Sequence, residues 1–215
     1  MIAVVIVVDL SDDVESYAAT FPKLALPRPP ACPGCGAAGH LIGHGSYRRT
    51  VVEPTVGIPI PIKRLLCTAC HHTVSLLPTF CLPFRHYGTA TIQTVLGQRI
   101  EAHASWIRVA RCFVPSDLPT LTTCREWVDT FTRASDRYLS ALLRHLATWT
   151  ARSSTIEVVL ADIGARPTGP AQLVAAVPHL LAGLREAGLQ IPAGGRRWLG
   201  TLWQWGWGMQ LGRLV

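Results

Sequence analysis

Four cysteines of this chain stand in two pairs of identical spacing, Cys32-x-x-Cys35 and Cys67-x-x-Cys70, with thirty-one residues between the pairs. Three chemistries use thiols in this way: a thioredoxin-type redox pair, two disulfides, or a tetrahedral metal site. A redox pair follows a strand and opens a helix, whereas Cys32 follows Pro-rich sequence and Cys35 precedes Gly-rich sequence. Seven cysteines, an odd number, also disfavour a complete disulfide framework. We therefore predict one structural Zn2+ ion bound by these four thiolates.

Four protein ligands leave no open position on the ion for a substrate water, so the predicted site is structural rather than catalytic. Four histidines lie close to the two pairs in sequence, but four cysteines already complete the coordination shell. The three remaining cysteines fall on apolar stretches and are expected to act as small buried hydrophobes. These residues are His40, His44, His71 and His72, and Cys81, Cys112 and Cys124.

The N-terminal sequence "MIAVVIVVDLSDD" has no basic residue before its apolar run and is followed by acidic residues. This pattern predicts a buried strand rather than a secretion signal, and hence a cytoplasmic protein, where disulfides are rare. The longest uncharged apolar run, residues 167–184, is interrupted by three prolines. A membrane-spanning helix needs about 20 mostly apolar residues, so we expect no transmembrane segment.

The positive charge of the chain, +7 in total, is concentrated around the cysteine pairs. Residues 32–111 contain eight lysines and arginines but only two acidic residues. A local excess of this kind suggests a polyanionic partner.

The sequence predicts an α+β fold: a small zinc ribbon of short antiparallel strands, followed by a mostly helical, helix-turn-helix-like region. We divide the chain into an N-terminal strand and short helix (1–26, with Ser11 as helix cap), the zinc ribbon (27–84), the helical region (85–155) and a Trp-rich helical extension (156–215). Helical periodicity begins at Thr89 and gives four apolar stripes. They are centred on residues 92–100, 106–113, 124–131 and 139–149.

Three short helices after a basic ribbon suggest a helix-turn-helix, in which the third helix enters the major groove of DNA. Ser116 or Thr120 would cap this helix, and its outward face would carry Thr122, Thr123 and Arg125. Glu126 and Asp129 share that face, and their carboxylates would repel phosphates. A helical bundle that only packs remains the alternative.

The cysteine pairs and the motifs between them resemble a bacterial zinc-ribbon/helix-turn-helix family of uncharacterised function. They are also similar to the N-terminal DNA-binding region of insertion-sequence transposases. The resemblance covers about residues 27–131. The matching stretches are "CPGCG" (32–36), "HGSYRR" (44–49), "IKRLLCTAC" (62–70), "SLLPTFCLP" (75–83) and "TCREW" (123–127).

The resemblance implies that the partner is double-stranded DNA and that residues on the ribbon strands contact its phosphates. Such contacts set the position of the protein on the duplex without reading base sequence. The implied contact residues are His44, Tyr47, Arg48, Arg49, Lys63 and Arg64.

We expect no catalytic activity. Transposase chemistry needs three carboxylates that hold two metal ions. The strand-like run "IEVVLADIG" ends near Asp162, and Glu186 is the one carboxylate that follows it. We find no nucleophile elbow, phosphate-binding loop or His-Glu-x-x-His motif.

The main hypothesis is therefore a zinc-dependent DNA-binding protein, related to transposase DNA-binding regions but without a catalytic domain. The alternative is a protein-interaction adaptor that uses the ribbon as a scaffold and the Trp-rich tail as a docking surface, with another protein or a second copy of the chain as partner. The tail holds Trp198, Trp203, Trp205 and Trp207. We favour rings that pack on the helical region over an in-plane membrane anchor, because the tryptophans do not form one helical face.

Overall fold

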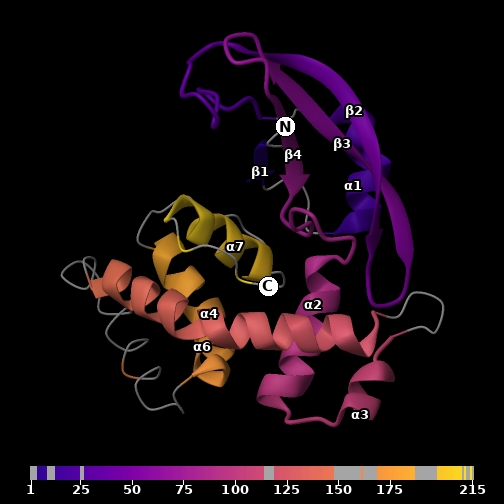
Figure 1. Ribbon diagram of the computed structural model, residues 1–215, viewed down its shortest axis with the longest axis vertical. Coiled ribbons are helices and arrows are strands. Elements are labelled where there is room, and N and C mark those ends of the chain that lie inside the picture. Colours follow the sequence, from indigo (N-terminus) through magenta and orange to yellow (C-terminus); the bar gives the residue numbers. More distant parts are fainter. Residues whose placement is uncertain are drawn as a thin grey trace.

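The computed structural model describes residues 4–8, 13–24, 27–113, 119–147, 161, 169–186, 198–209, 211 and 214. It confirms the predicted α+β class, since a four-stranded mixed sheet is combined with several helices (Figure 1). The run "IEVVLADIG" and Asp162 lie outside the described residues. The division of the chain into four segments stays a prediction.

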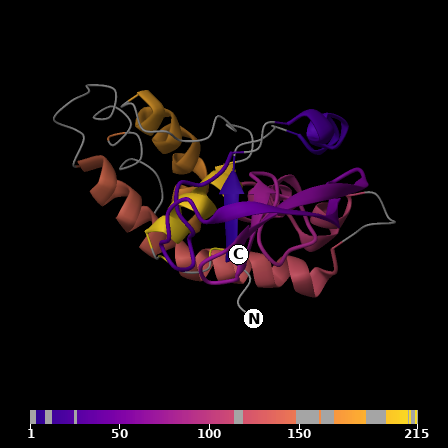
Figure 2. The same cartoon turned by 90° about the horizontal axis from the view of Figure 1, so that it is seen from above.

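The sheet has the strand order β1-β4-β3-β2. β2 (Leu41–Val52) and β3 (Gly57–Cys67) form a long antiparallel hairpin, and β4 (Thr73–Pro78) pairs antiparallel with β3. β1 (Val4–Val8) pairs parallel with β4 at the other edge, with Val7 almost fully buried. The predicted N-terminal strand is therefore confirmed, with Val7 buried and Val5, Ile6 and Val8 partly buried, and it belongs to the same sheet as the ribbon. Figures 1 and 2 show the curved hairpin extending away from β1.

The alternation of side chains along β3 divides the core into two clusters. Ile60 and Ile62 belong to the large cluster that the sheet shares with the helices. Leu65 and Cys67 belong to a small cluster beside the cysteine pairs. The metal-binding end of the sheet thus has a core of its own, built from only six buried residues.

The short helix α1 (Val14–Thr20) and the 3-10 turn η1 (Phe21–Lys23) follow β1. The Asp13 side chain caps α1 by accepting a hydrogen bond from the Ser16 N–H at 2.7 Å. The prediction of Ser11 as the cap is therefore wrong, because the cap is Asp13, two residues later. Tyr17 fixes α1 on the hairpin, because its hydroxyl donates to the Pro61 carbonyl at 2.9 Å.

The helical region begins with α2 (Thr89–Leu96), which continues into a π-helical turn, η2 (Gly97–Glu101), and then α3 (Trp106–Ala110). The next helix, α4 (Leu121–Ala147), has 27 residues. The predicted third and fourth stripes therefore lie on one long helix, so the expectation of a short third helix is wrong. Thr120 does cap it, as predicted, by accepting from the Thr123 N–H at 3.1 Å. Residues 111–120 link α3 and α4, a longer connection than the 3–4 residues of a helix-turn-helix.

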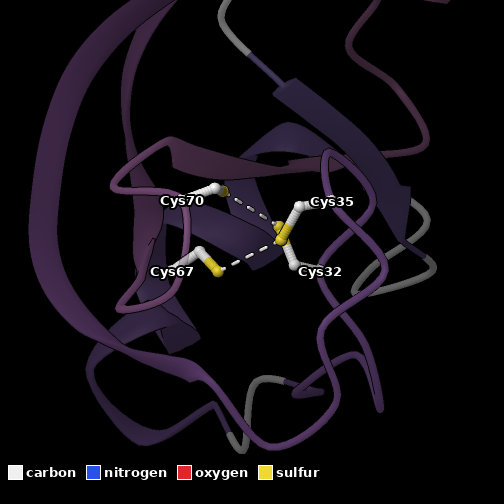
Figure 3. A group of neighbouring side chains, drawn as sticks. All are labelled: Cys32, Cys35, Cys67 and Cys70. Atoms are coloured by element: carbon white, nitrogen blue, oxygen red, sulfur yellow. Dashed lines mark hydrogen bonds between the residues drawn. The ribbon is translucent and has the colours of Figure 1, made fainter.

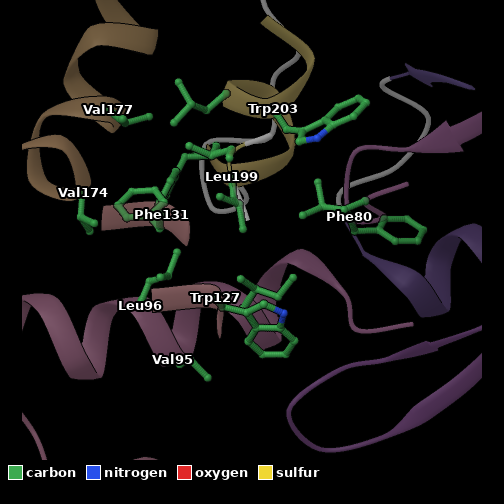
Figure 4. Close-up of a cluster of buried hydrophobic side chains, with 14 of the residues drawn as sticks. Phe80, Val95, Leu96, Trp127, Phe131, Val174, Val177, Leu199 and Trp203 are labelled. Atoms are coloured by element: carbon green, nitrogen blue, oxygen red, sulfur yellow. The ribbon is translucent and has the colours of Figure 1, made fainter. Parts of the chain in front are cut away.

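The C-terminal helices α6 (Pro170–Glu186) and α7 (Trp198–Gly208) complete the large core around Trp127 and Phe131 of α4 (Figure 4). Trp198 and Trp203 are each only 8% exposed. The prediction that the tail packs on the helical region is confirmed for these rings. Within the described ranges, no helix is long and apolar enough to cross a membrane.

Candidate metal centre and basic groove

The two cysteine pairs lie in loops of nearly identical backbone geometry. In the first, the Gly36 N–H donates to the Cys32 carbonyl at 2.7 Å; in the second, the His71 N–H donates to the Cys67 carbonyl at 2.9 Å. Both donors have a left-handed backbone, with φ of 75° at Gly36 and 58° at His71. In each loop the N–H of the first cysteine also donates to the carbonyl five residues further on, at 2.9 and 3.0 Å. The repeated Cys-x-x-Cys spacing therefore builds two equivalent metal-binding knuckles.

The two knuckles face each other and bring all four sulfur atoms together (Figure 3). The Sγ atoms of Cys32 and Cys70 are 3.8 Å apart, those of Cys35 and Cys67 are 3.7 Å apart, and all four lie within 4.8 Å of one another. A tetrahedral ion with metal–sulfur bonds of about 2.3 Å requires sulfur atoms about 3.8 Å apart. Two of the sulfur pairs already have this separation, so the four thiols can hold one tetrahedral metal ion after small side-chain movements.

The same distances exclude disulfides in this arrangement, because a disulfide bond is about 2.05 Å long. The nearby histidines are not part of the site. Of the described residues, the group able to hold a metal ion contains the four cysteines alone. His40 is exposed and bonds through Nδ1 to the Thr68 hydroxyl at 3.0 Å, while the Thr68 N–H donates to the His40 carbonyl at 2.9 Å. His40 thus joins the two knuckles without contributing a ligand.

The thiols of Cys67 and Cys70 differ in how readily they ionise. The backbone N–H of Cys70 stabilises a thiolate at Cys67 and lowers the pKa of Cys67 to about 7. At Cys70 the N–H of His72 acts in the same direction, but desolvation and the neighbouring thiols, led by that of Cys35, raise the pKa of Cys70 to about 12. At neutral pH the metal-free cluster therefore retains the Cys70 proton and part of the Cys67 proton.

These protons predict that metal affinity falls as pH falls. The Cys70 proton must leave before the metal binds at any pH below about 12, and this one proton by itself lowers the affinity about tenfold for each unit by which the pH falls. Below about pH 7 the Cys67 proton must leave as well, so the dependence steepens. Competition with a chromophoric chelator between pH 8 and pH 6 measures this dependence. An affinity that is constant over this range would contradict the ligand set.

The predicted DNA contacts on the hairpin fall on both faces of the sheet. Arg49 pairs with Ile60 and Tyr47 with Ile62, so both lie on the face of the large core. Arg64 joins them, with its guanidinium 5.6 Å from the centre of the Tyr47 ring. Lys63, one position along β3, lies on the opposite face. His44 is exposed where the register of β2 shifts, between Gly43 and Ser46.

A hollow of about 590 Å3 lies beside this part of the hairpin. It is lined by residues 47–50 of β2, residues 83–86 after β4, and Val5, Ser75 and Leu77 of β1 and β4. Of the described residues that line it, three are arginines and none is Asp or Glu. We call this hollow the basic groove. It gathers Tyr47, Arg48 and Arg49 from the predicted contacts, but not His44, Lys63 or Arg64.

A family model matches residues 32–110. Its description is "Domain of unknown function (DUF6431)". The match covers less than half of the chain; it begins at the first cysteine of the metal centre and ends with α3. It therefore includes both knuckles, the hairpin and the loop that closes the basic groove. Searches of curated proteins and of solved structures found no match. The relation to transposases stays a prediction from sequence resemblance.

The remaining predicted contacts lie at the start of α4 and are not among the residues that line the groove. Thr122 and Arg125 are exposed, and the Arg125 guanidinium is 5.7 Å from the centre of the Trp106 ring. Thr123 is partly buried, with its hydroxyl 2.9 Å from that of Thr120. The Thr123 hydroxyl therefore takes part in the cap of α4 and is not a free surface group.

Sequence reasoning missed one wall of the groove, residues 83–86, "PFRH". These residues lie in an irregular loop, where hydrophobic periodicity gives no signal. One signal was available: an aromatic residue followed by two basic residues after a proline, in the most basic part of the chain.

Proposed function

We propose that this chain is a zinc-stabilised DNA-binding module without catalytic activity of its own. The observation that carries the proposal is the combination of a tetrahedral four-sulfur site with an arginine-lined groove on one sheet. The metal site stabilises the end of the hairpin, and the groove receives the phosphate backbone.

Zinc is the metal that best fits the site. Four thiolates in tetrahedral arrangement favour Zn2+, or iron in sulfur coordination, over the harder ions that prefer oxygen ligands. The paired Cys-x-x-Cys knuckles have the spacing of structural zinc sites. Because the four sulfurs fill the coordination shell, the ion supplies folding free energy and no chemistry.

The phosphate backbone of DNA suits the basic groove for electrostatic reasons. Arg48, Arg49 and Arg85 line it, and the absence of a carboxylate among its described lining residues leaves a positive field. A guanidinium donates two parallel hydrogen bonds to a phosphate, so closely spaced arginines hold a backbone firmly. Arg49 and Arg85 are half-buried beside the groove, whereas the side chain of Arg48 alternates to the opposite, exposed face of β2.

Salt dependence tests the proposal and separates it from a protein-interaction adaptor. Two phosphate contacts, at Arg49 and Arg85, predict that affinity for a 20-base-pair duplex falls roughly 12-fold between 50 and 200 mM salt, because counterions are released on binding. Fluorescence anisotropy measures this fall. Undetectable binding at 50 mM salt would reject the proposal. Because the Trp198 and Trp203 rings are buried, these two rings do not offer the docking surface that the adaptor alternative places on the tail.

A matched pair of arginine variants locates the contact. Arg85→Gln removes one charge from the loop that lines the groove and should reduce the slope of log affinity against log salt by about one. Arg144→Gln removes the same charge from an exposed position of α4, outside the groove, and should leave the slope unchanged. Equal effects of the two substitutions would show that only the net charge of the protein matters.

A further inference from the structure

Phe84 is the most exposed large apolar side chain of the described residues, at 80%. Its backbone is left-handed, with φ of 59°, a conformation that bulky residues rarely adopt. Neither burial nor backbone preference therefore explains a phenylalanine at this position. Backbone strain and an exposed aromatic ring at one residue are more typical of a binding site.

The loop around Phe84 is held at both ends. On one side, the Arg49 guanidinium donates to the Leu82 carbonyl at 2.7 Å. On the other, the Val52 N–H donates to the His86 carbonyl at 2.9 Å, and the Tyr87 ring packs edge-on against Trp127 at 5.1 Å. The exposed ring thus projects from a fixed loop. A ligand that stacks on it does not have to order the backbone first.

The surroundings of Phe84 indicate the chemistry of such a ligand. Phe84 lines the basic groove together with Arg49 and Arg85, so apolar and cationic surfaces meet there, and none of the described lining residues carries a carboxylate. An aromatic platform beside a positively charged groove is the arrangement by which proteins hold unpaired nucleotides. The groove, at about 590 Å3, has the volume of a small-molecule site and has room for one or two nucleotides.

We propose that Phe84 stacks against an unpaired DNA base while the groove arginines hold the adjoining phosphates. The preferred ligand is then DNA that contains an unpaired base, because the bases of an intact duplex are already stacked on one another. This inference rests on the proposed function but is narrower, since DNA binding by charge alone needs no aromatic ring.

The test compares two labelled duplexes that differ only in one extra, unpaired 2-aminopurine in the centre of the second. The unsubstituted protein is expected to bind the second duplex more tightly and to quench its 2-aminopurine fluorescence. Phe84→Ala should lose about tenfold in affinity for that duplex and change little for the intact one. Phe84→Tyr should retain both the affinity and the quenching.

Two further variants exclude indirect effects. Phe84→Asn removes the ring and accepts a left-handed backbone more readily, so it should keep or raise the melting temperature while losing the same affinity. Met209→Ala removes an exposed apolar side chain outside the groove and should leave binding unchanged.

Equal affinity for the two duplexes, or equal losses on both when Phe84 is substituted, would overturn this inference and leave DNA binding intact. Absence of binding to either duplex at low salt would overturn both proposals.

Discussion

Replacing Cys67 by Ser is expected to release the metal ion and unfold the metal-binding end of the sheet. Cys67 is fully buried where β3 ends, and its carbonyl also closes the second knuckle. The cluster around it has only six buried residues, two of them metal-binding cysteines. A structural zinc ion supplies folding free energy of about 10 kcal/mol or more, so this small core should not hold without the ion.

The rest of the molecule should persist in this variant. Trp127 and Phe131 belong to the separate large cluster, which the sheet shares with the helices and which contains no metal ligand. A cooperative melting transition should therefore remain, while limited proteolysis cuts within residues 27–43 and 65–74.

Elemental analysis gives the direct readout: about one zinc ion per chain in the unsubstituted protein, and none in Cys67→Ser. Cys112→Ser is the matched control, because this half-buried thiol lies outside the sulfur cluster. The control should keep its zinc and its resistance to protease. A Cys67→Ser protein that retains stoichiometric zinc would disprove the assigned ligand set.

The metal centre could be predicted from the sequence because its geometry is local. Each Cys-x-x-Cys pair forms its knuckle through backbone hydrogen bonds within six residues, and the residue after each pair has the left-handed backbone. A glycine, as at Gly36, indicates a left-handed backbone from the sequence, whereas a histidine, as at His71, does not. The two knuckles meet because the β2–β3 hairpin pairs the start of β2 with the end of β3.

The partner of β1 could not be predicted in the same way. Its run of valines and isoleucines indicates burial, but an apolar run does not indicate which strand it pairs with. The parallel pairing of Val7 with Leu77 spans the whole segment that carries the four clustered cysteines. The basic groove depends on this non-local pairing, because Val5 of β1 forms part of its lining.

The length of α4 was misjudged for a different reason. Residues 132–138, "TRASDRY", separate two apolar stripes and contain four charged or hydroxyl side chains on exposed positions. Ala134 and Tyr138 nevertheless continue the buried face, at helical spacing from Phe131. Because Ala134 and Tyr138 do not stand out as core residues in the sequence, the hydrophobic pattern predicts two helices where the structure has one.

Replacing Gly200 by Ala is expected to destabilise the protein, although alanine is the better helix former. A Cβ atom at Gly200 of α7 would lie 1.9 Å from the carbonyl oxygen and 2.9 Å from the carbonyl carbon of Thr79. Both atoms belong to the backbone that follows β4, so no side-chain rotation relieves the clash. The helix must move away, and the buried Leu199 beside it loses its packing. Overpacking of this kind costs about 1–3 kcal/mol, and more where backbone must shift.

The sign of this effect distinguishes a packed tail from an exposed one. If α7 were a free or membrane-bound helix, Gly200→Ala would stabilise it by about 1 kcal/mol, since glycine is a poor helix former. In the packed tail, the clash with Thr79 outweighs this gain. For a chain of this size the melting temperature should fall by about 5–10 °C.

Gly43→Ala provides the matched control, because nothing lies within 4 Å of a Cβ atom at that position and the backbone is not left-handed. It should leave the melting temperature unchanged or raise it slightly. Both variants should be measured with zinc bound, so that loss of metal does not enter the comparison. A Gly200→Ala protein that melts at or above the temperature of the unsubstituted chain would mean that α7 does not lie against the end of β4.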